Sequence, residues 1–175
     1  MPHTIRTQRL LMRPPSPRDA RVFSLVLNDW RVVANTGTWP YPLTKERAAF
    51  RLRYAQGMKP LEDHVFALFH GGAFIGTCGI HRERGPVYSI GYMLGVDYWG
   101  KGFATEALRA VCDFGWRICR AERIAGDAFI SNPASCRVMQ KVGMGFVRSE
   151  PGWSAARGAY LPMNRYEMTR TEFRP

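Results

Sequence analysis

Polar and apolar residues alternate in some segments of the chain and recur at helical spacing in others. Residues 4–13 alternate and predict a first strand, which a proline-rich stretch ends. Ser16, followed by a proline at the first helical position, predicts the N-cap of a helix to about residue 28. Thr44 predicts the cap of a second helix, which reaches about residue 56.

The middle of the chain is rich in β-prone residues. Residues 65–69 and 73–80 flank the pair Gly71-Gly72, which is typical of a tight hairpin. A third strand is expected at about 87–96, directly before a glycine-rich loop. Hairpin partners run antiparallel, so these segments predict the antiparallel part of a sheet.

The last part of the chain returns to helical spacing. A helix from the glycine-rich loop to about residue 119 leads to a strand at 124–130, and a helical crossover of this kind favours parallel strands. Asn132 predicts the cap of another helix, which ends at Gly143. Closing strands are predicted at 146–148 and 160–169. The expected fold is a mixed α/β (α+β) sheet, mostly antiparallel, with helices on both faces.

The composition is that of a basic protein of 175 residues, which we expect to form one domain over residues 1–175. The formal net charge of +11 comes from 21 Arg and 4 Lys, and it favours anionic partners such as cofactor phosphates, nucleic acid or the ribosome. No apolar run reaches the roughly 20 residues of a membrane span. The first residues lack the apolar core of a signal peptide, so we expect a cytoplasmic location.

The cysteines and histidines show no spacing typical of metal ligands, which predicts reduced structural thiols and no metal. Cys136 falls in the first turn of a predicted helix, where the helix dipole favours a thiolate and a covalent intermediate on sulfur is an alternative. No histidine of the sequence can be placed beside it, so a buried structural thiol is the favoured interpretation.

Three interpretations compete for the glycine-rich loop around Gly100 and Gly102. Glycines before a helix start let backbone N–H groups approach an anion, which predicts a phosphate site. Gly95, Gly100 and Lys101 nearly form a Walker A loop, but that motif needs a Ser or Thr as magnesium ligand where Gly102 stands. The glycines can also simply make a turn.

The wider segment IGYMLGVDYWGKGFATEAL, residues 90–108, resembles the acetyl-CoA loop of the GNAT family of N-acetyltransferases, with its Q/R-x-x-G-x-G/A motif. Trp99 stands where Gln or Arg is usual, which is familiar in the branch resembling ribosomal-protein N-terminal acetyltransferases. The helix start from Asn132 to Ser135 and both ends of the chain are also similar to that branch. The resemblance implies a GNAT fold with a splayed pair of parallel strands.

In the family, acetyl-CoA is the cosubstrate and its pantetheine arm fills the gap between the splayed strands. The residues implied for acetyl-CoA binding are Met93, Leu94, Val96, Trp99, Gly100, Lys101, Gly102, Phe103, Ala104, Thr105, Asn132 and Ser135. A backbone N–H near Leu94 is implied as the donor to the oxyanion, and Ser135 as the group that protonates the departing thiolate. Many relatives use a Tyr on this helix instead, where Met139 stands.

The general base and the acceptor are less well defined. Branch members often carry a Glu where Ser89 stands, and Glu83 or His81 is expected to relay the proton instead. Trp39 and Tyr41 lie in the region that resembles the acceptor site.

The expected activity is direct transfer of acetyl to a primary amine, either a protein N-terminal α-amine or a small-molecule amine. Ribosomal-protein N-termini are among the expected acceptors. The alternative is a CoA-binding or RNA- or ribosome-associated module on the same fold with little catalysis. The sequence leaves monomer and homodimer both open.

Overall fold

The computed structural model describes residues 3–56 and 63–175. The strands are β1 (Ile5–Arg6), β2 (Leu11–Arg13), β3 (Asp63–His70), β4 (Ala73–Arg84), β5 (Val87–Leu94), β6 (Arg123–Phe129), β7 (Gly145–Ser154) and β8 (Ala159–Thr169). The helices are α1 (Ala20–Leu27), α2 (Trp30–Val33), α3 (Lys45–Gln56), α4 (Phe103–Arg117) and α5 (Pro133–Lys141), with short 3-10 turns at Pro17–Asp19 and Val96–Tyr98. This arrangement confirms the predicted mixed α/β class.

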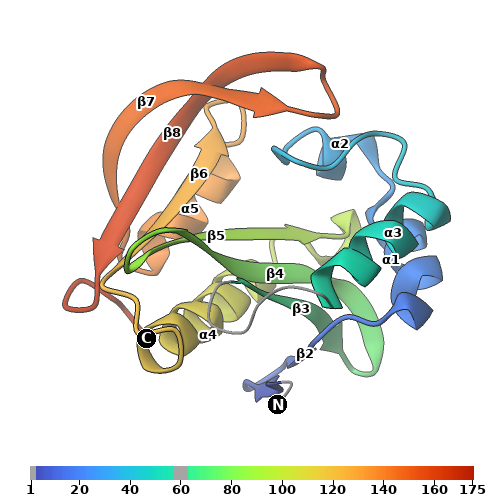
Figure 1. Cartoon of the computed structure of the whole chain (residues 1–175), viewed down its shortest axis with the longest axis horizontal. Helices are drawn as coiled ribbons and strands as arrows, with labels where there is room; N and C mark the ends of the chain where they lie inside the picture. Colours follow the sequence, from blue (N-terminus) through green and yellow to red (C-terminus); the bar gives the residue numbers. More distant parts are fainter. Residues whose placement is uncertain (1–2, 57–62) are drawn as a thin grey trace.

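The strands form one sheet in the order β1-β2-β3-β4-β5-β6-β8-β7. As predicted, β5 and β6 are parallel, while the other neighbouring strands run antiparallel. The parallel contact joins Val87–Ile90 to Arg123–Gly126 and stops there, although both strands continue. Figure 1 shows β6, β8 and β7 turning away from β5 beyond this contact. The expected splayed pair is therefore present.

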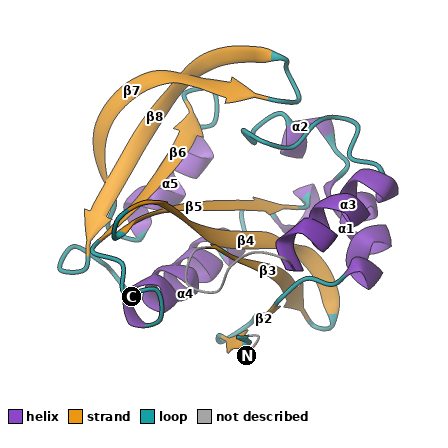
Figure 2. Cartoon of the chain, viewed as in Figure 1, coloured by secondary structure: helices purple, strands orange, loops and turns teal. Residues whose placement is uncertain are grey.

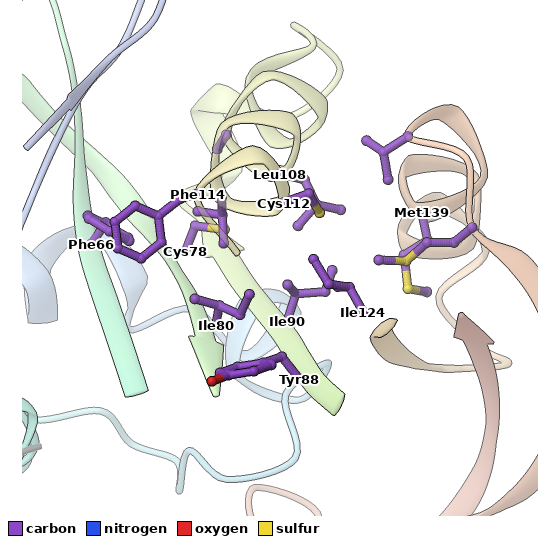
Figure 3. Close-up of a cluster of buried hydrophobic side chains, with 14 of the residues drawn as sticks. Phe66, Cys78, Ile80, Tyr88, Ile90, Leu108, Cys112, Phe114, Ile124 and Met139 are labelled. Atoms are coloured by element: carbon purple, nitrogen blue, oxygen red, sulfur yellow. The ribbon is translucent and has the colours of Figure 1, made fainter. Parts of the chain in front are cut away.

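Helices cover both faces of the sheet (Figure 2). On one face, α4 and α5 pack on the central strands, and Figure 3 shows Leu108 and Cys112 of α4 and Met139 of α5 against Ile90 and Ile124. On the other face, α1 to α3 form a second cluster with parts of β3, β4 and β5. Strand β5 lies between these two cores, because Ile90 belongs to the first and Met93 to the second.

The first strand differs from the prediction, because residues 4–13 form the short pair β1 and β2 instead of one strand. A turn separates them, in which Thr7 N–H donates to the Leu10 carbonyl at 3.0 Å. The Thr7 hydroxyl and the Arg9 N–H both donate to Glu106 on α4, at 2.6 and 2.8 Å. Because this partner lies far away in the sequence, the alternating pattern could not reveal the turn.

Two further differences concern strand β7 and helix α2. The strand predicted at 146–148 continues through Pro151 and Gly152, because β7 is the last strand of the sheet and an edge strand tolerates proline. The predicted connection between the first two helices contains α2, which Asp29 caps by accepting from Arg31 N–H at 2.8 Å. Its four residues are too few to show a helical period in the sequence.

The predicted cap at Ser16 is confirmed as a reciprocal capping box with Asp19. The Asp19 carboxylate accepts from Ser16 N–H at 2.8 Å and forms a bidentate ion pair with Arg13 at 2.7 and 2.8 Å. Burial raises the pKa of this carboxyl, but the hydrogen bonds from Arg13 and Ser16 outweigh burial and hold it below its usual value.

Asp19→Asn is therefore expected to lower the free energy of unfolding by about 2 kcal/mol near neutral pH. A depressed folded-state pKa contributes stability above the unfolded pKa of about 3.9, and this is lost as the pH falls through the folded pKa. Urea unfolding at about pH 7 and about pH 3 should show the difference from wild type shrinking in acid. The exposed pair of Asp113 with Arg117 provides a control, since Asp113→Asn should cost less than about 0.5 kcal/mol. An equal Asp19→Asn deficit at both pH values would contradict the assignment.

Candidate active site

A cleft of about 830 Å³ opens where β5 and β6 separate. Its walls come from β4, β5, the starts of α4 and α5, and the connection between α2 and α3. The predicted site residues that line it are Trp39, Met93, Leu94, Trp99, Gly100, Gly102, Phe103, Ala104, Thr105, Asn132 and Ser135. The fold thus brings most of the predicted site together from distant parts of the chain.

The predicted site residues Tyr41, Val96, Lys101 and Glu83 are not among the described residues that line this cleft. Tyr41 packs edge-on against Trp30, with ring centroids 5.3 Å apart. Val96 packs against the cluster of α1 to α3. Lys101 Nζ donates to the Asp97 carbonyl at 2.7 Å, which directs its charge along the loop.

Beyond its contact with β6, one edge of β5 faces the cleft. Gly95 N–H donates to the Ile75 carbonyl at 3.0 Å, and residues of an antiparallel pair alternate between facing the partner strand and facing away. Tyr92 and Leu94 therefore turn their backbone groups toward the gap, whereas Met93 turns its groups toward β4. This register favours Tyr92 and Leu94 over Met93 as backbone partners for an extended ligand along β5.

Trp99 connects the glycine-rich loop to the edge of β5 through a hydrogen bond. Its indole Nε1 donates to the Leu94 carbonyl at 2.9 Å, so this carbonyl already has a partner. The Leu94 N–H is then the backbone group that β5 directs into the cleft at this position. It is also the atom predicted to stabilise the oxyanion.

The loop leads into the start of α4 through two glycines in left-handed backbone conformations. Gly100 has φ 72° and Gly102 has φ 80°, values that side chains other than glycine rarely adopt. In this described segment no side chain caps α4, and the Gly102 carbonyl accepts from Glu106 N–H at 3.1 Å. The N–H groups of the first helical turn are therefore directed at the cleft without intrahelical acceptors, as in anion sites at helix starts.

Arg9 is a cation beside this loop that the sequence did not single out. Its guanidinium donates to the Lys101 carbonyl at 2.9 Å, forms an ion pair with Glu106 at 2.6 Å and stacks 4.6 Å over the Phe103 ring. A second hollow of about 600 Å³ adjoins it and shares Gly102 and Thr105 with the cleft. A long anionic ligand can therefore pass from the cleft over the loop toward Arg9.

Ser135 lies in the first turn of α5 and faces the cleft. The Asn132 side chain accepts from Ser135 N–H at 3.3 Å and so caps the helix, as predicted. Gly126 lets α5 approach the sheet, because a methyl group there would lie only 2.7 Å from the sulfur of Met139. The close contact of α5 with β6 is what sets the position of the Ser135 hydroxyl.

Tyr92 is the partner of Ser135 that sequence reasoning missed. Its hydroxyl donates to Ser135 Oγ at 3.0 Å, from β5 to α5. Burial raises the pKa of Tyr92 to about 12, so the phenol keeps its proton near neutral pH. Because Ser135 accepts from Tyr92, its own proton is free to point into the cleft. Many relatives carry a tyrosine on this helix at the position of Met139, whereas in this chain Tyr92 of strand β5 contacts the Ser135 hydroxyl.

The Glu83 carboxylate is held in an ion-pair network around Arg165 on β8. Arg165 contacts Glu83 at 2.6 Å, Glu167 at 2.9 Å and Asp127 at 3.2 Å. Burial raises the pKa of Asp127, an effect that the charge of Arg165 only partly offsets, and Asp127 lines the cleft. Both oxygens of the Glu83 carboxylate accept hydrogen bonds from Arg165, at 3.1 and 2.6 Å, so this geometry does not favour Glu83 as the base.

The wall opposite the sheet is formed around Trp39. The Arg51 guanidinium stacks 4.6 Å over the Trp39 ring and donates to the Thr38 hydroxyl at 2.7 Å. Thr38 and Arg31 also line the cleft on this side. Trp39 therefore lines the cleft, whereas Tyr41 packs outside it, and a role of Trp39 at the acceptor stays a prediction.

The thiols are buried, and burial raises the pKa of Cys78 to about 12. Cys136 is also buried, as expected of a structural residue. Among the described residues, no group of His, Cys, Asp or Glu side chains is arranged to hold a metal ion. None of the helices in the described ranges has the length and apolar character to cross a membrane.

Residues 9–145 match the family model of the acetyltransferase (GNAT) domain, and the chain belongs to this family. Protein YkkB of Bacillus subtilis is 31% identical over 163 residues, covering 88% of this chain and 92% of YkkB. A GNAT-family acetyltransferase structure from Bacillus anthracis has a TM-score of 0.84 at 23% identity, covering 97% of this chain and 100% of that one. RimL, a ribosomal L7/L12 alpha-N-protein acetyltransferase solved with coenzyme A, has a TM-score of 0.80 at 17% identity, covering 95% of this chain and 98% of that one.

Proposed function

We propose that this acetyltransferase uses acetyl-CoA and transfers the acetyl group directly to a primary amine. The observation that carries the proposal is the free edge of β5, which runs from its separation from β6 to the uncapped start of α4. An extended pantetheine arm matches a strand edge, and a pyrophosphate matches N–H groups at a helix start. The residues present therefore fit acetyl-CoA, and the coenzyme A bound in the RimL structure supports the same use of the fold.

Residues of the cleft provide an oxyanion donor and a proton donor for the departing thiolate, both of which acetyl transfer needs. The Leu94 N–H is directed to where an oxyanion would form, and its neighbours in the strand keep it there without reorganisation. Ser135 holds a proton toward the cleft and can give it to the departing thiolate, while Tyr92 can replace that proton through their hydrogen bond. Attack by the amine nitrogen forms the amide bond and breaks the C–S bond, so no acyl-enzyme is required.

The acceptor that we propose is a primary amine at a protein N-terminus, with small-molecule amines as the other substrate class. The similarity to RimL, a ribosomal L7/L12 alpha-N-protein acetyltransferase, supports the first class. The net charge of +11 supports it further, because it would attract an acceptor presented on an anionic particle such as the ribosome.

The test is thiol release from acetyl-CoA with a panel of hexapeptides beginning with Ser, Ala or Met and a panel of small primary amines. We expect turnover with at least one acceptor, and mass spectrometry should show one acetyl group on its amine. N-terminally blocked versions of the same peptides are the matched control and should give no acetylated product.

Binding of CoA without turnover by any acceptor would contradict the proposed enzyme. It would favour the alternative of a CoA-binding or ribosome-associated module. Retention on RNA that weakens steeply with added salt would then be the expected property.

A further inference from the structure

Three polar residues lie side by side across the face of the sheet that borders the cleft. Asp63 on β3 is directly opposite His81 on β4, and His81 is directly opposite Ser89 on β5. Residues opposite each other in adjacent antiparallel strands place their side chains on the same face, within reach of one another. His81 and Ser89 both line the cleft.

The Asp63 carboxylate fixes the orientation of the His81 imidazole. Nδ1 of His81 lies 2.8 Å from Asp63 Oδ1, so the neutral ring carries its proton on Nδ1 and leaves Nε2 as the acceptor. A carboxylate in this position holds the ring in the orientation and tautomer that a general base needs.

Two glycines leave room for Nε2 at the point where the sheet opens. A methyl group on Gly79 would lie 2.9 Å from His81 Nε2, so the ring lies over this glycine. Gly79 is directly opposite Gly91 on β5, and a methyl group on Gly91 would meet no atom within 4 Å among the described residues. Gly91 is the first residue of β5 beyond the contact with β6, so the open space adjoins the gap.

We propose that His81 is the general base of the acetyl transfer and that Asp63 is its positioning residue. The inference rests on the proposed function and deepens it. His81 Nε2 takes one proton from the protonated amine, which breaks one of its N–H bonds. The neutral nitrogen then bonds to the thioester carbonyl carbon and loses a second proton to solvent as the amide forms. The electron pair of the C–S bond leaves with sulfur, which takes its proton from Ser135. His81 then returns its proton to solvent, and Ser135 regains a proton from solvent by way of Tyr92.

The surroundings distinguish His81 from the carboxylates on the same face. Charged groups there are Asp63 on β3, Glu83 on β4, Asp127 on β6, and Arg165 and Glu167 on β8, while Arg31 and Arg51 line the cleft from the helical side. Glu83, Asp127 and Glu167 all pair with Arg165. His81 instead pairs through Nδ1 with a carboxylate, which leaves its Nε2 without a cationic partner among the described contacts.

His81→Gln is expected to lower kcat/KM for a Ser-starting hexapeptide about 30-fold near neutral pH. The deficit should shrink to about threefold near pH 9, because an α-amine with a pKa of about 8 is then neutral without a base. His3→Gln is the matched control, since His3 packs against His64 and Phe114 and should leave the pH profile unchanged. A His81→Gln profile parallel to that of wild type at every pH would overturn the proposal.

Two more variants separate catalysis from structure. Asp63→Asn should lower kcat several-fold with little change in the KM for acetyl-CoA, because it disturbs the ring and not the cofactor. Ser89→Glu added to His81→Gln should restore at least about tenfold of the lost rate, since it places a carboxylate directly opposite position 81. An inactive double variant that folds and binds CoA would count against the assigned position.

Nitrogen-15 NMR of the imidazoles provides a readout that needs no acceptor. The expected neutral tautomer of His81 has its proton on Nδ1, and Asp63→Asn should disturb it. A wild-type protein without turnover refutes the proposed function, and the tautomer then decides whether the Asp63–His81 geometry is correct. Turnover that is insensitive to His81→Gln refutes the base alone. A proton on Nε2 contradicts the proposal in either case.

Discussion

Replacing Ser135 by Ala is expected to lower kcat about 100-fold while the affinity for CoA changes less than about twofold. The hydroxyl accepts from Tyr92 at 3.0 Å and can direct its proton to the departing sulfur. This proton transfer occurs only when the C–S bond breaks, so its loss affects kcat and not the binding of CoA. The cap of α5 comes from the Asn132 side chain and the Ser135 backbone N–H, so Ala should keep the helix start. Thiol-release kinetics and calorimetric titration with CoA measure the two quantities.

Tyr92→Phe tests the tyrosine that donates to Ser135 and should lower kcat about tenfold. Ser135 would keep its own proton, but no phenol would replace that proton after its transfer to sulfur. An exposed hydroxyl, Ser149 on β7, provides the matched control, and Ser149→Ala should leave kcat unchanged. If Ser135→Ala turned over at the wild-type rate, protonation of the thiolate by this residue would be refuted.

Gly102→Val is expected to weaken CoA binding at least about 100-fold, equivalent to about 2.7 kcal/mol. Gly102 has φ 80°, a conformation that β-branched side chains avoid, and it is the residue from which α4 begins. A methyl group there would already lie 3.3 Å from the Arg9 guanidinium, and the two methyl groups of valine would cover the N–H groups of the helix start. Isothermal titration with CoA measures the loss.

Gly158→Val controls for the backbone strain of this substitution. Gly158 has φ 61° in the turn between β7 and β8, and a methyl group there would meet nothing within 4 Å. Gly158→Val should lower the free energy of unfolding, measured in urea, about as much as Gly102→Val does. Its affinity for CoA should stay within about twofold of wild type. CoA binding by Gly102→Val as tight as that of Gly158→Val would show that the loop is not the phosphate site.

Elements with strong local signals were predicted well from the sequence. The capping box at Ser16, the hairpin at Gly71-Gly72 and the cap at Asn132 depend on residues within a few positions of each other. Where the deciding contact is distant, prediction failed. The first strand is broken by the contact of Thr7 with Glu106, and β7 extends past Pro151 only because it lies at the edge of the sheet.

In the candidate site too, contacts between neighbours in the sequence were predictable and contacts between distant residues were not. The loop residues Trp99 to Thr105 lie together because they are consecutive, so their motif could be recognised in the sequence. Glu83 was a reasonable candidate for the base until the structure placed Arg165 at 2.6 Å from its carboxylate. No local pattern indicates that pairing, because Arg165 comes from the far end of the chain.

The amino-acid sequence was sufficient to predict the family, most secondary-structure elements and the position of the glycine-rich loop before α4, because each depends on residues that are neighbours in the sequence. The tertiary structure alone decided which side chains meet in the cleft: Tyr92 with Ser135, Asp63 with His81, and Arg165 with Glu83. The physical reason is that these contacts depend on strand order and register. Both are set by the packing of the whole sheet against α4 and α5 on one face and α1 to α3 on the other.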